Sequence, residues 1–222
     1  MEYRRVLLSE IIVSSDWRYS MLTFEGILSL DKDSLQETAK GLSNDDISKL
    51  VEWLTQKDDT IRYQAFLLLQ HRSALFGDVY PYWNSFRDKL KSDNSYQRSL
   101  GLMLIAENVK WDSEERILDA IDPYLKLLND EKPITIRQCI QSLTKIVPYK
   151  PELEGKIAEH LVSLDLMAVK ETMRKSILLD ILKVLLLIRK DFRTDEIDSY
   201  IMKALSGEIL DEKSKKQIEA LF

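Results

Sequence analysis

Side chains that could ligate a metal or act as a nucleophile are few in this sequence of 222 residues. It contains two histidines, His71 and His160, and a single cysteine, Cys139. Neither histidine has a second metal-ligating residue four positions further along, and one thiol cannot form an internal disulfide bond. We therefore expect no metal site and no cofactor. We expect both histidines at helix surfaces or ends, and Cys139 as a half-buried, inert thiol.

Adjacent carboxylates could perform acid–base chemistry, and they recur at positions 45–46, 58–59 and 114–115. Neighbouring residues on a helix point in different directions, so we interpret these pairs as helix caps or solvated faces. The six glycines form none of the spaced patterns that cradle a nucleotide phosphate. We therefore predict no catalytic residue.

A lone carboxylate, Asp180, interrupts the apolar stretch 177–188. Burying an unpaired carboxylate is costly, so we expect a basic partner for Asp180, either Arg137 or Arg174. Exposure to solvent and a functional role are the alternatives. The stretch is 12 residues long, whereas crossing a bilayer takes roughly 20 apolar residues. We expect a buried core helix and no contact with a membrane.

The elements that position these side chains are predicted to be helices. Apolar residues recur at intervals of three and four, the helical period, as in Ile47, Leu50, Val51 and Leu54. Strand-like alternation does not occur over any comparable length. Glycine and proline together number only 11, too few for a molecule built from many tight β-turns. The fold class is therefore predicted to be all-α.

Five short segments open a helix in the same way. Each has an apolar residue followed by a polar residue, and this polar residue is arginine in four of the five segments. These segments are 16–18, 60–62, 95–97, 135–137 and 172–174. Their spacings of 44, 35, 40 and 37 residues indicate stacked helix pairs, in which each unit needs its neighbours to cover its apolar face.

A helix pair of about 40 residues, with an apolar–arginine pair opening its second helix, resembles a HEAT repeat. The resemblance covers most of the chain and departs at Gln97, where Arg98 follows one residue later. It implies a right-handed α-solenoid of about five to six helix pairs, forming a single domain over 1–222 with a terminal capping pair near 194–222. First helices are predicted at 2–13, 45–56, 79–91, 114–129, 151–165 and 194–206, each followed by a second helix.

Three features depart from a regular repeat. An extra turn or short helix is predicted at 31–42, and a polar-faced terminal helix at 211–222. Pro123 lies inside the first helix predicted over 114–129. Either the helix is kinked there, which we favour, or it begins at Asp122.

The resemblance also implies roles for individual residues. The arginines that open the second helices resemble ladder arginines, which pair with acidic residues of adjacent units. The structural ladder is then Arg18, Arg62, Arg137, Arg174 and Asp180. A partner-binding surface is expected on the second helices, which line the concave side. Its candidate residues are Tyr63, Phe66, Gln70, Arg98, Gln138, Gln141, Lys145 and Lys175.

These features favour a non-enzymatic scaffold or adaptor that binds a partner protein on its concave face. The alternative is a DNA-binding repair protein, because a family of alkylpurine DNA glycosylases also uses HEAT-like repeats. The segment 170–193 supports this alternative with seven basic and three acidic residues. The net charge of −5 opposes it, because a surface that binds phosphates is basic. We expect a cytoplasmic protein and leave its partner and oligomeric state open.

Overall fold

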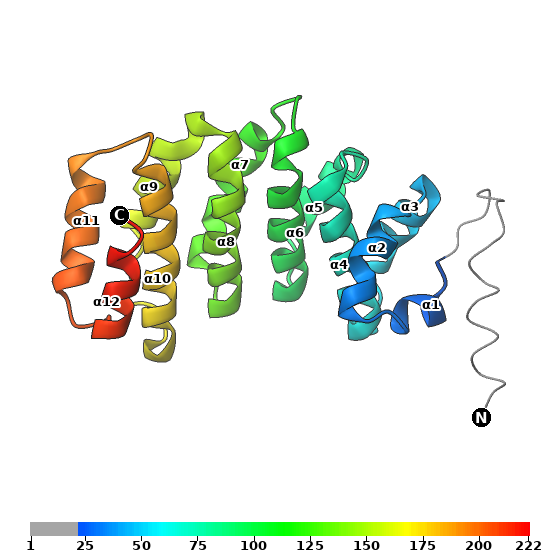
Figure 1. The fold of residues 1–222 in the computed structure, drawn as a ribbon, viewed down its shortest axis with the longest axis horizontal. Coiled ribbons are helices and arrows are strands. Elements are labelled where there is room, and N and C mark those ends of the chain that lie inside the picture. Colours follow the sequence, from blue (N-terminus) through cyan, green and yellow to red (C-terminus); the bar gives the residue numbers. More distant parts are fainter. Residues whose placement is uncertain (1–21) are drawn as a thin grey trace.

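The computed structural model describes residues 22–222, and every regular element in that range is a helix (Figure 1). The α-helices are α1 (Phe24–Leu28), α2 (Lys32–Lys40), α3 (Asn44–Trp53), α4 (Asp59–Leu75), α5 (Trp83–Lys89), α6 (Ser95–Asn108), α7 (Ile117–Leu125), α8 (Pro133–Ile146), α9 (Glu154–Val162), α10 (Glu171–Ile188), α11 (Asp195–Ser206) and α12 (Glu212–Glu219). Short 3-10 segments are η1 (Tyr80–Tyr82), η2 (Val109–Trp111), η3 (Lys126–Asn129), η4 (Val147–Tyr149) and η5 (Pro151–Leu153).

These helices form an α-solenoid, which confirms the predicted fold class. The second helices α4, α6, α8 and α10 form a row in which each contacts the next, with α2 before it and α12 after it. Figure 1 shows α6, α8 and α10 side by side along this row. The first helices α3, α5 and α9 pack against the second helices that follow them. The first helix predicted at 2–13 and the ladder residue Arg18 lie outside the described residues.

The predicted first helices from residue 45 onward are present, but three of them, α5, α7 and α9, begin three or four residues later than predicted. In the units of α5 and α9, a 3-10 turn takes up the beginning of the helix. The helix predicted from 114 begins only at Ile117, because Glu115 adopts a φ angle of 55°, which ends any preceding helical turn. Helix α7 contains Pro123 and continues to Leu125 before it changes to 3-10 geometry. It therefore does not begin at Asp122.

A continuous hydrophobic core lies between the two layers of helices, with buried residues from Ile27 to Ile218. Its middle is formed by second helices that have neighbours on both sides, such as α8 with Ile140 fully buried. The last two helices contribute less, since α11 buries Ile197 and Ile201 and α12 buries Ser214 and Ile218. Within residues 22–222, the middle helices are therefore more completely buried than the last two.

Arginines close the turn between the two helices of a unit at three equivalent positions. Arg62, Arg98 and Arg174 each lie four residues after the N-cap residue of their helix. Arg62 donates hydrogen bonds to the carbonyls of Gln56 and Lys57 at 2.6 and 3.0 Å. The guanidinium groups of Arg98 and Arg174 bind carbonyls of their own preceding turns in the same way.

The implied ladder therefore needs correction. Arg62 pairs with Asp59 of its own helix and Arg174 binds carbonyl groups, so among the described residues neither pairs with an acidic residue of an adjacent unit. Arg98, expected to bind a partner, takes the position of Arg62 and is buried in an ion pair with Asp130 at 2.6 Å. Arg137, by contrast, lies five residues after its N-cap residue, Lys132, so its side chain points to the next unit. The departure from the regular pattern is thus at Arg137 and not at residue 97.

Cys139 is fully buried, so the expectation of a half-buried thiol is wrong. Its Sγ lies 3.4 Å from the carbonyl oxygen of Tyr124, to which it donates a hydrogen bond. Burial raises the pKa of the Cys139 thiol far above its usual value. The reactive thiolate is therefore scarce in the folded chain.

We predict that iodoacetamide alkylates Cys139 at least about a thousandfold more slowly in the folded chain than in urea, because reaction requires transient opening. Mass spectrometry of samples taken over time measures both rates. Free glutathione in the same reaction serves as the control for reagent activity. Similar rates in the folded and unfolded chains would show that the thiol is accessible.

Candidate functional site

A groove of about 400 Å³ crosses the exposed side of the second helices α4, α6 and α8. We call it the α4–α6–α8 groove. Helix α4 contributes side chains at intervals of three and four residues, which lie on one helix face. The groove is lined by Tyr63, Phe66, Leu67, Gln70, Ser95, Tyr96, Ser99, Leu100, Met103, Ile134 and Gln138.

The lining of this groove is mostly apolar and carries no charged side chain. Tyr63 and Ile134 are 52% and 54% exposed, which is high for large side chains of this kind. Phe66 is buried beside Tyr63, with the two ring centroids 6.4 Å apart. Burial raises the pKa of Tyr96, so its phenol stays neutral at physiological pH. Such a surface can bury an aromatic or aliphatic group of a ligand.

One amide in the groove has no partner within residues 22–222. The Gln138 side chain is half-buried and forms no hydrogen bond with any described residue. An amide can both donate and accept hydrogen bonds, so Gln138 can pair with a peptide group of a ligand. It therefore adds direction to a contact that is otherwise apolar.

Three linked polar side chains, Gln70, Glu107 and Lys145, border the groove. The Gln70 amide donates to Glu107 of α6 at 2.8 Å, and Lys145 of α8 forms an ion pair with the same carboxylate. These contacts connect three consecutive second helices. Gln70 and Lys145, both expected to bind a partner, are therefore held by Glu107 and fix the spacing of the helices that form the groove.

Asp180 is the centre of a second polar link, between α8 and α10. Its carboxylate, 5% exposed, accepts hydrogen bonds from Arg137 at 2.7 Å and from Gln141 at 3.1 Å. Arg137 is one of the two partners expected from the sequence. Arg174 instead binds the carbonyls of Met167 and Val169. Asp180 thus has a structural role, and Gln141, expected to bind a partner, is engaged with it.

The structure gathers four of the eight residues expected to bind a partner, namely Tyr63, Phe66, Gln70 and Gln138, in the groove. Lys175 lies elsewhere and pairs with Asp211 at 2.5 Å. The groove residues not anticipated from the sequence include Tyr96, Met103 and Ile134. Counting from the N-cap residues Asp58 and Asn94 would have identified two of the α6 positions, because it aligns Ser99 with Tyr63 and Met103 with Leu67.

The charge of the basic segment 170–193 is partly compensated by Asp198 of α11 and by Asp211, which precedes α12. Arg189 and Arg193 both pair with Asp198, at 2.5 and 2.7 Å, and lower the pKa of that carboxyl. Lys175 pairs with Asp211, and Arg174 is bound to carbonyl groups. These contacts reduce the positive charge that this segment offers to a phosphate backbone.

Two further features bear on the kinds of site in the described part of the chain. Among residues 22–222, no three histidine, cysteine or acidic side chains are grouped so that they could hold a metal ion. None of the helices in that range has the length and hydropathy needed to cross a membrane.

The described residues thus form a helical-repeat protein with an uncharged groove on its row of second helices. No protein-family model and no curated protein matches this chain. Among solved structures, it is similar to a designed armadillo repeat protein, YIII(Dq)4CqI, with 14% sequence identity and a TM-score of 0.49. The similarity covers 89% of this chain and 88% of that one.

Proposed function

We propose that this chain is a protein-interaction scaffold whose α4–α6–α8 groove binds a segment of a partner protein. The observation that carries the proposal is the uncharged groove between Tyr63 and Ile134, each more than half exposed. Large apolar side chains exposed around a cavity are typical of interaction sites. Solenoids of stacked helix pairs commonly present such extended surfaces to partners.

The groove favours an extended segment over a helix. Adjacent packed helices lie about 8–10 Å apart, so three second helices span roughly 20 Å, the length of about six extended residues. Gln138 is free to pair with peptide groups, which are available in an extended chain and already used in a helix. Tyr63 and Ile134 then act as contacts for apolar side chains of the segment.

The same proposal includes the finer classification of the repeats as HEAT-like and a non-catalytic role in the cytoplasm. The HEAT-like classification is supported by the arginines that recur at the fourth position after the N-cap residue in α4, α6 and α10. The core of the proposal, binding of a segment in the groove, can be tested without knowing the partner.

We predict that peptides selected from a random displayed library on the wild-type chain bind the double variant Tyr63→Ser, Ile134→Ser about a hundredfold more weakly, because two central contacts are lost. Fluorescence anisotropy with labelled peptides measures the dissociation constants. The matched control is Leu118→Ser, Tyr149→Ser, which removes two side chains 41% and 54% exposed that lie outside the groove.

Selected peptides should bind the control variant as tightly as the wild type. Equal affinity for the groove variant and the wild type would place the binding surface elsewhere. Failure to enrich any peptide would contradict recognition of short segments. Circular dichroism of all three chains checks that helical content is unchanged.

A further inference from the structure

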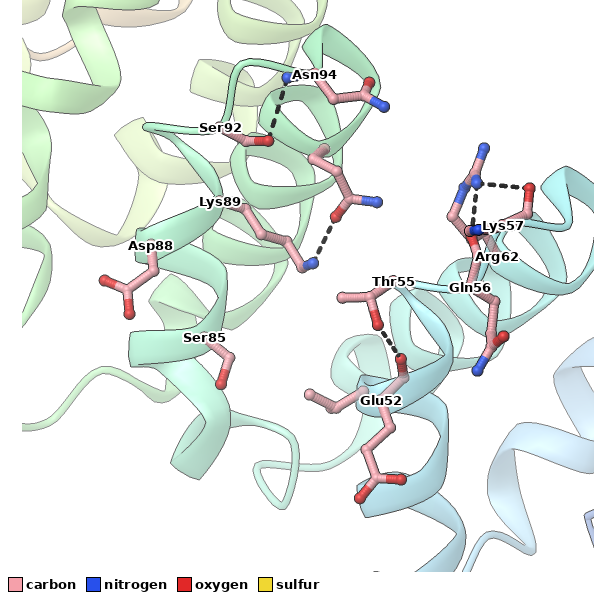
Figure 2. A pocket seen from close by; sticks show the side chains of 12 residues that line it. Glu52, Thr55, Gln56, Lys57, Arg62, Ser85, Asp88, Lys89, Ser92 and Asn94 are labelled. Carbon is pink, nitrogen blue, oxygen red and sulfur yellow. Dashed lines mark hydrogen bonds between the residues drawn. The ribbon is translucent and has the colours of Figure 1, made fainter.

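A second cavity, of about 710 Å³, lies between the turn that joins α3 to α4 and the neighbouring helices α5 and α6 (Figure 2). We call it the Lys89 cleft. All of its lining residues except Val51 have polar side chains, and aliphatic parts of these side chains also face the space. The lining consists of Val51, Glu52, Thr55, Gln56, Lys57, Arg62, Ser85, Asp88, Lys89, Ser92, Asn94 and Gln97. Hydrogen-bond donors and hydroxyl groups predominate, so the cleft suits a polar ligand.

Lys89 is held in a fixed position in this cleft. Gly101 allows α6 to approach α5 so closely that a Cβ atom there would lie 2.7 Å from the Phe86 carbonyl oxygen. The Lys89 ammonium donates a hydrogen bond to Oε1 of Gln97 at 2.5 Å. The Gln97 amide in turn donates to the Leu54 carbonyl at 2.7 Å, across the cleft in the preceding unit. The ammonium is therefore held where the two units face each other.

Lys89 has no carboxylate partner in the described part of the chain. It is half-buried, and burial lowers the pKa of its ammonium group, since the charged form loses hydration. Figure 2 shows the ammonium directed into the space beside Thr55, whereas the carboxylates of Glu52 and Asp88 point away from it. A half-buried cation bound only by a neutral amide is an incomplete arrangement.

The balance of charge in the cleft favours a single negative charge. Of the charged lining residues, Arg62 already pairs with Asp59, and Asp88 pairs with Arg87. Lys57, Lys89 and Glu52 remain, which leaves one positive charge. A carboxylate carries one negative charge and would balance it. A phosphate group carries about −1.5 to −2 at pH 7, more than the cleft compensates.

The Lys89 cleft adjoins the α4–α6–α8 groove. The Arg62 guanidinium, which lines the cleft, lies over the Tyr96 ring, which lines the groove, at 4.9 Å from the ring centroid. At the start of α6, Asn94 and Gln97 face the cleft, while Ser95 and Tyr96 face the groove. Arg62 and Tyr96 thus separate the two cavities by a single layer of side chains, and a chain lying in the groove can reach the cleft over them.

We propose that the Lys89 cleft receives a carboxylate of the segment that lies in the groove, in direct contact with the Lys89 ammonium. The proposal rests on the proposed function and specifies the partner: an extended segment with apolar side chains that carries an acidic residue, or its free C-terminus, at the end that passes over Arg62 and Tyr96. The apolar part is bound by the groove, and the carboxylate fixes the direction of the segment.

The first experiment tests the anion site alone, with sodium acetate as the probe and sodium chloride at equal ionic strength as the control. The resonances of the lysine side chains are followed by NMR in the full ¹³C-labelled chain, with Lys89→Gln used to assign Lys89. We expect a saturable shift of the Lys89 resonance with acetate alone. Lys91, exposed and outside the cleft, should not show it. Equal, unsaturated shifts at both lysines would overturn the proposal.

The second experiment uses a peptide selected on the wild-type chain. Selected sequences should share an acidic residue at one end, and Lys89→Gln should weaken binding about tenfold, since hydrogen bonds to charged groups are among the strong ones. Lys89→Arg keeps the charge and should restore much of the affinity. When the acidic residue of the peptide is replaced by the corresponding amide, the wild type and Lys89→Gln should bind the peptide with equal affinity.

The two proposals fail in different ways. Peptides that lack an acidic residue and bind Lys89→Gln as tightly as the wild type would overturn the carboxylate site. They would leave the proposed function intact. If no peptide binds, the proposed function fails, and the acetate titration still decides whether Lys89 binds a carboxylate.

Discussion

Replacement of Arg98 by alanine is expected to lower the free energy of unfolding by about 3 to 5 kcal/mol, because it leaves a buried charge without its partner. The Arg98 guanidinium binds both oxygens of Asp130, at 2.6 and 2.8 Å, and the Asp130 side chain is only 3% exposed. Arg98 also donates hydrogen bonds to the carbonyls of Ser92 and Asp93. One substitution thus removes the link between two units and the closure of a turn.

Urea denaturation followed by circular dichroism measures this loss. Arg193→Ala is the matched control, since Arg193 is also paired with a carboxylate but its side chain is 63% exposed. Arg193→Ala should lower the free energy of unfolding by at most about 1 kcal/mol, as is typical of surface ion pairs. A similarly small loss for Arg98→Ala would contradict the role assigned to the pair. The double variant Arg98→Met, Asp130→Leu should regain part of the stability, because it leaves no unpaired charge while the carbonyls of Ser92 and Asp93 still lack their donor.

The substitution Ile140→Ala is expected to lower the free energy of unfolding by about 2 to 5 kcal/mol, because it leaves a cavity in a packed core. Ile140 is fully buried on α8, which contacts second helices on both sides. Neither neighbour can move toward the cavity without losing its own contacts. The loss should therefore lie well above that of a surface substitution.

The same helix offers a matched control for this measurement. Ile134 is 54% exposed, so Ile134→Ala removes the same atoms from α8 and should change the free energy of unfolding by no more than about 0.5 kcal/mol. The difference between the urea unfolding midpoints of Ile140→Ala and Ile134→Ala gives the contribution of burial to stability. Equal changes in the two variants would show that the packing of α8 has been assigned to the wrong face.

The repeat architecture could be predicted from the sequence because it depends on local spacing. The apolar positions of 47–54 and 61–69 fall on the buried faces of α3 and α4, and their period of three and four residues is visible without knowledge of the fold. The register of the third unit could not be read from arginine positions alone. Arg98 and Gln97 are neighbours, and only the N-cap residue Asn94 shows which of them corresponds to Arg62.

The groove was predictable in part, on one face of α4 and at Gln138 of α8. Tyr63, Phe66 and Gln70 share one face of α4, whereas Tyr96 and Ile134 complete the groove from helices whose relative rotation depends on packing. The pairs that hold Lys145 and Lys175 join residues 38 and 36 positions apart. This separation equals about one repeat, so opposite charges one repeat apart are a usable signal for contacts between units.

The uneven packing along the solenoid has a consequence for how the chain opens. Helix α12 buries only Ser214 and Ile218 and lies at an end of the row, whereas α6 and α8 each have a neighbour on both sides. Each unit of a solenoid is stabilised by its own packing and by its neighbours, so an end unit can detach while the rest stays folded. Backbone amide hydrogens of α12 should therefore exchange with deuterated water long before those of α6 and α8, and the groove persists through this fraying because the central helices form it.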